Sequence, residues 1–265
     1  MKKLVLQGFV LLVLFVGVWL GLSQINWMKL FKINTVIEEV PEKLGEMYWK
    51  FFQEHQVEVL DSTIVQPIDS LIQHICTSNG IDPTKIKLHI LSVNEINAFS
   101  LPDRHLVIYT GLLNATKTED QLCGVISHEI AHMERNHVMK KLIREIGLST
   151  LLSSTTGGYN GEFILESAKI LTSTAYDREW ENEADLKAVQ YLQNAHINVK
   201  GLSQILEVIA ASDSDPSHSL TWLSSHPDTW ERIRLIQKLG NGKNKNLTPI
   251  LTDITWNKMK SSLNE

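Results

Sequence analysis

The stretch Ile126–His137 reads ISHEIAHMERNH and carries two histidines and a glutamate in the order His128, Glu129, His132. On a helix with about 100° per residue, the two histidines lie about 40° apart and one turn above each other, and Glu129 lies about 60° from His132 on the same side. Two imidazoles spaced in this way can bind zinc at about 2.1 Å each, with the carboxylate between them placed to reach a water on the metal. The spacing therefore predicts a zinc site of the kind found in hydrolases.

The residues around this pattern make the predicted helix mostly apolar, so the polar trio would be buried without partners unless a ligand satisfied it. Thr118 and Gln121 have the spacing of a capping box at the start of this helix. An alternative stays open on this stretch alone, namely two core histidines bonded to backbone groups with a glutamate nearby. The apolar flanks are Leu122, Val125, Ile126, Ile130 and Met133.

Composition indicates one globular body with a sizeable core. The chain has 265 residues, of which 43% are hydrophobic, and its net charge of -5 gives no sign of nucleic-acid binding. Cys76 and Cys123 are too few for a disulfide framework. We expect both to be buried thiols, with a disulfide as the less favoured alternative.

The N-terminus differs from the rest of the chain. From Leu4 to Leu22 it reads LVLQGFVLLVLFVGVWLGL, with Gln7 as its one clearly polar side chain. A helix of this length can cross about 30 Å of hydrocarbon, which favours an uncleaved membrane anchor over a cleaved signal. Lys2 and Lys3 before the run favour a cytoplasmic N-terminus. The body would then lie outside the cytoplasm, most simply in the periplasm at a bacterial inner membrane.

The expected organisation is an anchor or signal over residues 1–28, a connector over 29–43 and one domain over 44–265. Helical spacing of apolar residues runs from Ile64 to Ile75 and stops before Gly80. The segments KIKLHIL and NAFSLPDRHLVIYTGLL then read as short strands, the latter joined at Pro102 and Asp103. The fold class is thus α+β, mainly helical, with a small sheet or hairpin next to the HExxH helix and one transmembrane helix in front.

A catalytic zinc also needs a third protein ligand and an open position. His137 comes nine residues after His128, and on a continuing helix it would point about 180° away from the metal. The segment Tyr176–Leu192 offers a better candidate, because Glu181 and Asp185 are one turn apart on a strongly helical stretch. The glutamate can reach the metal while the aspartate bonds the far nitrogen of a ligand histidine. Alone, an acidic helix face is more often a solvated surface.

These motifs together resemble the membrane-associated gluzincin metalloproteases of the HtpX, BepA and CAAX prenyl protease type. The resemblance covers roughly residues 44–239 and implies a zincin-like metalloprotease domain. The motifs that carry it are HEIAH at His128–His132, ENEAD at Glu181–Asp185 with Arg178 before it, NAFSLP at Asn97–Pro102 and SHPDTWER at Ser225–Arg232.

The resemblance also implies roles for individual residues. The metal ligands would be His128, His132 and Glu181, around one zinc ion per chain. Glu129 would be the general base, and Asp185 would support a ligand histidine. Two further side chains, a histidine and an arginine, would face the metal site and steady the oxyanion. Alternatively, the histidine would cap the zinc in a resting state. They are His226 and Arg232.

An extended substrate could add to an edge strand through backbone hydrogen bonds. The residues of this strand are Asn97, Ala98, Phe99 and Ser100. Family members often have a glycine pair in the turn after this strand. Here Asp103 and Arg104 occupy these positions, which puts the rim of the substrate groove in doubt.

The sequence is thus expected to encode a membrane-anchored zinc endopeptidase. It would act on polypeptides, misfolded or envelope proteins, in quality control outside the cytoplasm, without nucleic acid. Two alternatives remain: a catalytically idle metal-binding scaffold or chaperone of the same fold, and a zinc hydrolase acting on a non-peptide amide. The intact Glu129 argues against the idle scaffold.

Overall fold

The computed structural model describes residues 16–17, 33–156, 161–212, 225–227, 229–240, 247 and 249–263. The expected membrane helix at 4–22 therefore lies outside the described residues, apart from two positions. Among the described helices, none is both long and apolar enough to cross a membrane. The chain divides into two compact units, Met1–Pro41 and Glu42–Glu265. The site and the elements that build it belong to the second unit.

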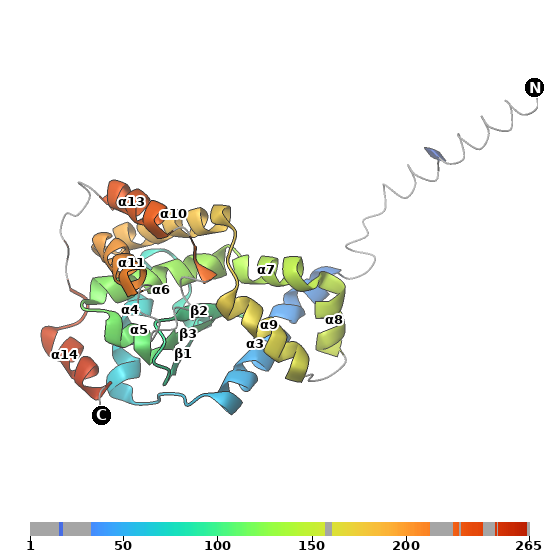
Figure 1. Cartoon of the computed structure of the whole chain (residues 1–265), viewed down its shortest axis with the longest axis horizontal. Coiled ribbons are helices and arrows are strands. Elements are labelled where there is room, and N and C mark those ends of the chain that lie inside the picture. The colour runs from blue at the N-terminus through green and yellow to red at the C-terminus, as the bar shows by residue number, and fades with distance from the viewer. Residues whose placement is uncertain are drawn as a thin grey trace, which may run out of the picture. The chain divides into compact units, whose positions relative to one another are not determined.

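The second unit is mainly helical, with one small sheet, as the α+β prediction required (Figure 1). The helices before the sheet and around its strands are α3 (Ile33–His55), α4 (Ser62–Ser78), the 3-10 turn η1 (Pro83–Lys85) and α5 (Thr110–Ala115). The HExxH helix and its successors are α6 (Glu119–Glu134), α7 (His137–Ile146), α8 (Leu148–Thr156) and α9 (Gly161–Ser173). The remaining helices are α10 (Arg178–Asn194), α11 (Lys200–Ser212), α13 (Thr229–Gly240) and α14 (Asp253–Ser262).

The sheet has three strands in the order β1-β3-β2, where β1 is Lys87–Leu91, β2 is Ala98–Leu101 and β3 is His105–Tyr109. β1 runs parallel to β3, and β2 forms the predicted hairpin with β3. The side chains of β2 are all buried. Within the described residues, β2 pairs with β3 alone, so its other backbone edge carries no strand partner.

The turn of this hairpin explains why glycines suit it. Asp103 and Arg104 both have a φ of 59°, in the left-handed region that glycine adopts more readily than other residues. Lys87 binds the Asp103 carboxylate, and Arg104 donates to the carboxylate of Glu134 near the end of α6. Because these ion pairs hold both strained residues, the hairpin forms without the glycine pair.

The HExxH helix is the centre of the fold and is buried from Gln121 to Met133. Thr118 caps it as predicted, accepting a hydrogen bond from the Gln121 backbone N–H. α10 and α11 pack along it, and α4 and β2 also contact it. At Gly124, an added Cβ would lie 2.7 Å from the Cα atom of Leu202 in α11. The glycine thus allows the close approach of two backbones.

The two cysteines are free and buried, as predicted. Burial raises the pKa of the Cys76 thiol to about 12 and that of the Cys123 thiol well above its ordinary value. Both behave as small apolar core residues, since a thiol without access to solvent is inert.

The hairpin turn yields a test of backbone strain. Arg104→Gly should be about 1 kcal/mol more stable than Arg104→Ala, because a Cβ in the left-handed region costs roughly 1–2 kcal/mol. Both variants lose the pair with Glu134, so their difference isolates the backbone. Urea unfolding midpoints would measure it. At Glu166, an exposed position inside α9, the order should reverse because alanine is the better helix former. The same order at both positions would contradict the strained turn.

Candidate metal centre

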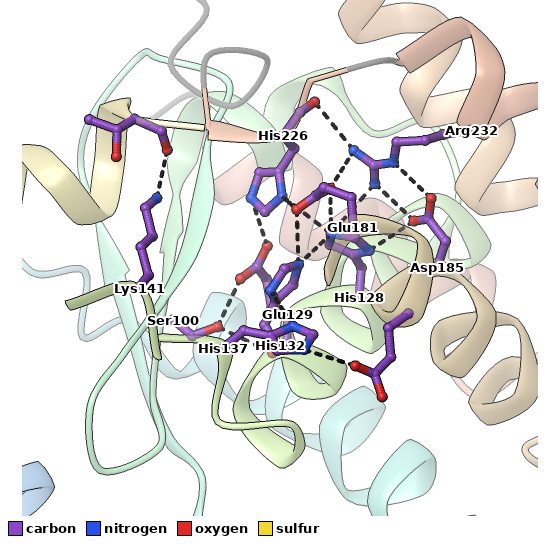
Figure 2. Close-up of polar contacts among 12 residues, drawn as sticks. Ser100, His128, Glu129, His132, His137, Lys141, Glu181, Asp185, His226 and Arg232 are labelled. Atoms are coloured by element: carbon purple, nitrogen blue, oxygen red, sulfur yellow. Dashed lines mark hydrogen bonds and ion pairs between the residues drawn. The ribbon is translucent and has the colours of Figure 1, made fainter. Parts of the chain in front are cut away.

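Three helices and one short segment bring the predicted site residues to one point (Figure 2). α6 supplies both histidines and the glutamate of the HExxH motif, and α10 supplies Glu181 and Asp185 one turn apart. His226 comes from the short described segment 225–227, and Arg232 comes from α13. Every one of these side chains is at most 2% exposed. Residues about 100 positions apart in sequence therefore meet in a closed, buried centre.

Four of these side chains form a group that could hold one metal ion, namely His128, His132, Glu181 and His226. The Nε2 atoms of His128 and His132 are 3.0 Å apart, and His226 Nδ1 is 3.3 Å from His128 Nε2. Glu181 Oε1 lies 2.8 Å from His226 Nδ1 and 3.2 Å from His132 Nε2. Tetrahedral zinc with bonds of about 2.1 Å needs donors about 3.4 Å apart. The donor types and their spacing therefore fit a zinc ion.

Asp185 and Arg232 hold this group from behind. Asp185 Oδ1 is 3.0 Å from Nδ1 of His128, the ring nitrogen on the far side from the donor group. Arg232 donates to both oxygens of Asp185, from Nε at 2.7 Å and from Nη2 at 2.8 Å. Its Nη1 lies 2.7 Å from Glu181 Oε2. One guanidinium thus bridges the two carboxylates of α10 and orients a histidine through one of them.

Glu129 lies beside the donor group and outside it. The hydroxyl of Ser100 in β2 donates to Glu129 Oε2 at 2.8 Å and to the Glu129 backbone carbonyl at 3.2 Å. The other carboxylate oxygen, Oε1, is 3.5 Å from His226 Nε2. Ser100 was expected to contribute backbone only, so sequence reasoning missed its side-chain role. One pattern in the sequence bears on it: residues two apart in a strand point to the same face, so the side chains of Ala98 and Ser100 share one face of β2.

The orientation expected for His137 was wrong. The prediction assumed a continuing helix, but α6 ends at Glu134 and α7 begins at His137. Between them, Asn136 has a φ of 55°, a left-handed conformation that asparagine tolerates better than most residues and that ends helices. The break turns His137 back toward the site, so that its Nδ1 lies 3.1 Å from Nδ1 of His132. His137 still lies outside the four-residue donor group, as predicted.

Charges in the centre are strongly coupled. Burial opposes a charge on His128, but hydrogen bonds to Asp185 and Glu181 outweigh it and raise the pKa of His128 from 6.5 to about 9. Burial lowers the pKa of His132 well below its usual range. Burial would raise the pKa of Glu181, yet the charges of His226 and Arg232 hold it well below its ordinary value. A proton and a metal therefore compete for His128.

Tyr176 and Lys141 form a second layer that no sequence pattern indicated. The Tyr176 ring lies 4.4 Å from the His132 ring and stacks on His226 at 5.4 Å. Its backbone N–H donates to the Ser225 carbonyl at 2.8 Å, which ties the segment carrying His226 to the end of the α9–α10 connection. Lys141 Nζ lies 3.9 Å from the centre of the tyrosine ring. Tyr176 thus packs against two of the four donors at once.

Comparison with known proteins agrees with this geometry. A model of peptidase family M48 matches residues 65–239, which is more than half of the chain. The mitochondrial metalloendopeptidase OMA1 of Schizosaccharomyces pombe is 26% identical over 200 residues, covering 73% of this chain and 58% of that relative.

Two other relatives extend the comparison. The mitochondrial metalloendopeptidase OMA1 of Bos taurus is 27% identical over 190 residues, covering 65% of this chain and 36% of its own. The beta-barrel assembly-enhancing protease of Escherichia coli is 23% identical over 200 residues, covering 70% and 40%. The chain thus spans between 36% and 58% of the length of these three relatives.

Proposed function

Because the chain belongs to peptidase family M48, we propose that it is a zinc-dependent endopeptidase that hydrolyses peptide bonds with water. The observation that carries this proposal is the buried set of four zinc-compatible donors with the Glu129 carboxylate beside it. Zinc bound there would supply a Lewis acid that polarises the scissile carbonyl and brings the pKa of water toward about 7. The side chains around it provide the remaining steps.

Glu129 is the proposed general base. Its Oε2 is held by the Ser100 hydroxyl, so Oε1 is the oxygen that accepts the proton of the attacking water and later delivers it to the leaving amine. Ser100 fixes the carboxylate in one orientation, so the Glu129 side chain loses little conformational freedom during the reaction. This division gives each oxygen of Glu129 a separate task.

We propose that His226 caps the metal in a resting form of the enzyme. Its Nδ1 would supply a fourth donor to a bound metal, whereas a catalytic zinc site keeps one position open. Substrate would have to displace the His226 ring before the carbonyl could enter. The displaced imidazole could then donate a hydrogen bond to the negative charge that develops on the carbonyl oxygen. Arg232 is less suited to that task because its guanidinium is already bound to Asp185 and Glu181.

The proposed substrates are polypeptides in an extended conformation. β2 is the edge strand of the sheet and lies next to Glu129, but its residues are buried in this state. A chain added there after this edge is uncovered would be held mainly by main-chain hydrogen bonds. The names of the relatives, metalloendopeptidase and beta-barrel assembly-enhancing protease, support a polypeptide substrate, and we propose a role in protein quality control. Misfolded or envelope proteins outside the cytoplasm are the class that we propose.

Membrane anchoring through the N-terminal segment is part of the proposal. The apolar run from Leu4 to Leu22 is long enough to span a bilayer, and Lys2 and Lys3 favour its N-terminus in the cytoplasm. The catalytic unit would then work on the non-cytoplasmic side, at the bacterial inner membrane and in the periplasm.

Two other functions fit less well. A metal-bound chaperone or scaffold without activity would have no need for a carboxylate oriented by Ser100 at this distance from the donors. A zinc hydrolase for another amide would use the same activated water. The edge strand favours the polypeptide, because it recognises a backbone that other amides lack.

Glu129→Gln tests the mechanism with one substitution. The variant should fold and retain one zinc per chain but cleave unfolded casein at least 10² to 10⁴ times more slowly, as expected for a missing general base. Glu181→Gln is the matched comparison, because it should weaken zinc binding itself. Metal content, thermal unfolding and casein cleavage would be measured on all three proteins. Equal cleavage by Glu129→Gln and the unchanged protein would end this mechanism.

His226→Ala separates the resting form from an oxyanion role. If the ring must leave before substrate enters, its removal should raise casein cleavage several-fold while zinc stays bound through the other three donors. If His226 mainly stabilises the oxyanion, turnover should fall by roughly a hundredfold. Initial rates at matched zinc occupancy would decide, and an unchanged rate would remove His226 from both roles.

The membrane proposal predicts how the protein fractionates. The full chain should stay with membranes through an alkaline carbonate wash, whereas a chain beginning at Lys29 should be soluble and still bind zinc, because the apolar run supplies no site residue. Immunoblots of the fractions would show this. A mature N-terminus near Gln24 would instead identify a cleaved signal.

A further inference from the structure

We propose that His137 is a positioning residue for His132, acting through a chain of hydrogen bonds that continues to Glu183 and ends at Arg135 on the surface. This inference rests on the proposed zinc site, because it concerns how one ligand of that site is oriented. It assigns a task to the helix break after α6, a feature that the mechanism above does not use.

The first observation is the geometry of the contacts, of which Figure 2 labels His132 and His137. Nδ1 of His132 is 3.1 Å from Nδ1 of His137, and Nε2 of His137 is 3.2 Å from Glu183 Oε2. Glu183 Oε1 is 3.0 Å from Arg135 Nε. Each contact uses a different atom, so the four side chains can be joined in series without competition.

Hydrogen-bond chemistry gives this series a direction. Nε2 of His132 faces the other donors of the metal centre, so it must keep a free lone pair to act as a ligand. The ring proton of a neutral His132 then sits on Nδ1 and is donated to Nδ1 of His137. That leaves His137 with its proton on Nε2, which donates to Glu183. With Nε2 of His132 kept free for the metal, this arrangement satisfies both histidine contacts of the series with neutral rings.

Packing keeps His137 in this place. Its side chain is fully buried and its ring stacks on Trp180 of α10 at 5.5 Å and 12°. The backbone is set by Asn136, whose left-handed conformation starts α7 at a new angle. Trp180 and Glu183 lie one turn apart on α10, the helix that also carries Glu181. The element that supplies a metal donor therefore also supplies the support for a second one.

The two HExxH histidines are held in different ways. His128 bonds directly to a buried carboxylate, Asp185, whereas His132 bonds to a neutral imidazole and reaches a carboxylate only through it. The side chain of Glu183 is 39% exposed, so the series of hydrogen bonds that starts at His132 ends at the solvent-exposed surface. Hydrogen bonds of this kind fix the tautomer and ring orientation of a metal ligand, and their loss typically weakens metal binding about 10–100-fold.

Two substitutions at His137 test the hydrogen bond against packing. His137→Leu keeps an apolar side chain of similar bulk but removes the acceptor, so zinc affinity should fall about 10–100-fold. In His137→Asn the amide oxygen takes the place of Nδ1, so affinity should stay within a few-fold of the unchanged protein. Competition with a chromogenic chelator measures both. Equal affinity in all three proteins, or equal loss in both variants, would overturn the proposal.

The far end of the chain has its own matched pair. Glu183→Ala should weaken zinc binding several-fold, because His137 loses the acceptor for its Nε2 proton. Glu179→Ala removes the same charge from an exposed position on the same helix and should leave affinity unchanged. Equal affinities for these two variants would show that the chain stops at His137 and would overturn its extension to Glu183.

A measurement without metal keeps the proposal separate from the proposed function. Long-range ¹⁵N–¹H spectra of histidine-labelled, metal-free full-length protein in detergent should show His132 protonated at Nδ1 and His137 at Nε2. Single histidine replacements would assign the signals. The opposite tautomers would overturn the proposal even if zinc binds. Failure of the unchanged protein to bind zinc would instead refute the proposed function, while the tautomers would still report on the chain of hydrogen bonds.

Discussion

The pairing of Arg232 with two carboxylates is the interaction on which the centre depends. Glu181 and Asp185 are buried, and an isolated buried carboxylate would cost several kcal/mol or would take up a proton. A single guanidinium contacts both carboxylates, and it does so from α13, far along the chain from α10. It lowers the pKa of Asp185, and together with His226 it lowers that of Glu181. The ionised pair can then hold His128 and offer an oxygen to the donor group. Removing the guanidinium would leave two buried carboxylates without this partner, so the contact ties α13 to α10 at the site.

Much of the fold and of the site could be predicted from the sequence, because local rules govern those parts. Helical periodicity places His128, Glu129 and His132 on one face, and an i,i+4 spacing does the same for Glu181 and Asp185. The hairpin between β2 and β3 and the two buried thiols were confirmed for similar reasons. Membership of the family was confirmed by comparison.

The remainder depends on contacts that periodicity does not contain. The orientation of His137 was mispredicted because one residue, Asn136, changes the helix direction, and the helical wheel assumes a straight axis. The hydroxyl of Ser100 was missed because its partner lies 29 positions away. Tyr176 has no motif at all, and its place against His132 and His226 emerges only from the packing of α6, α10 and the segment at 225–227. The roles of the individual site residues, the substrate strand, the membrane anchor and the residue boundaries of the domains remain predictions.

The short length of the edge strand β2 limits which conformations of a polypeptide can pair with it. Four residues of strand offer about 13 Å of backbone edge, at about 3.3 Å per residue. A chain that pairs along this edge must itself be extended over the same length, whereas the same residues in a helix would span about 6 Å with their amide groups already bonded internally. Since the side chains of β2 are buried, they can contribute little to selecting a sequence. If substrate pairs with this edge as proposed, the edge would discriminate conformational states, refusing a native domain and accepting the same polypeptide once it has locally unfolded.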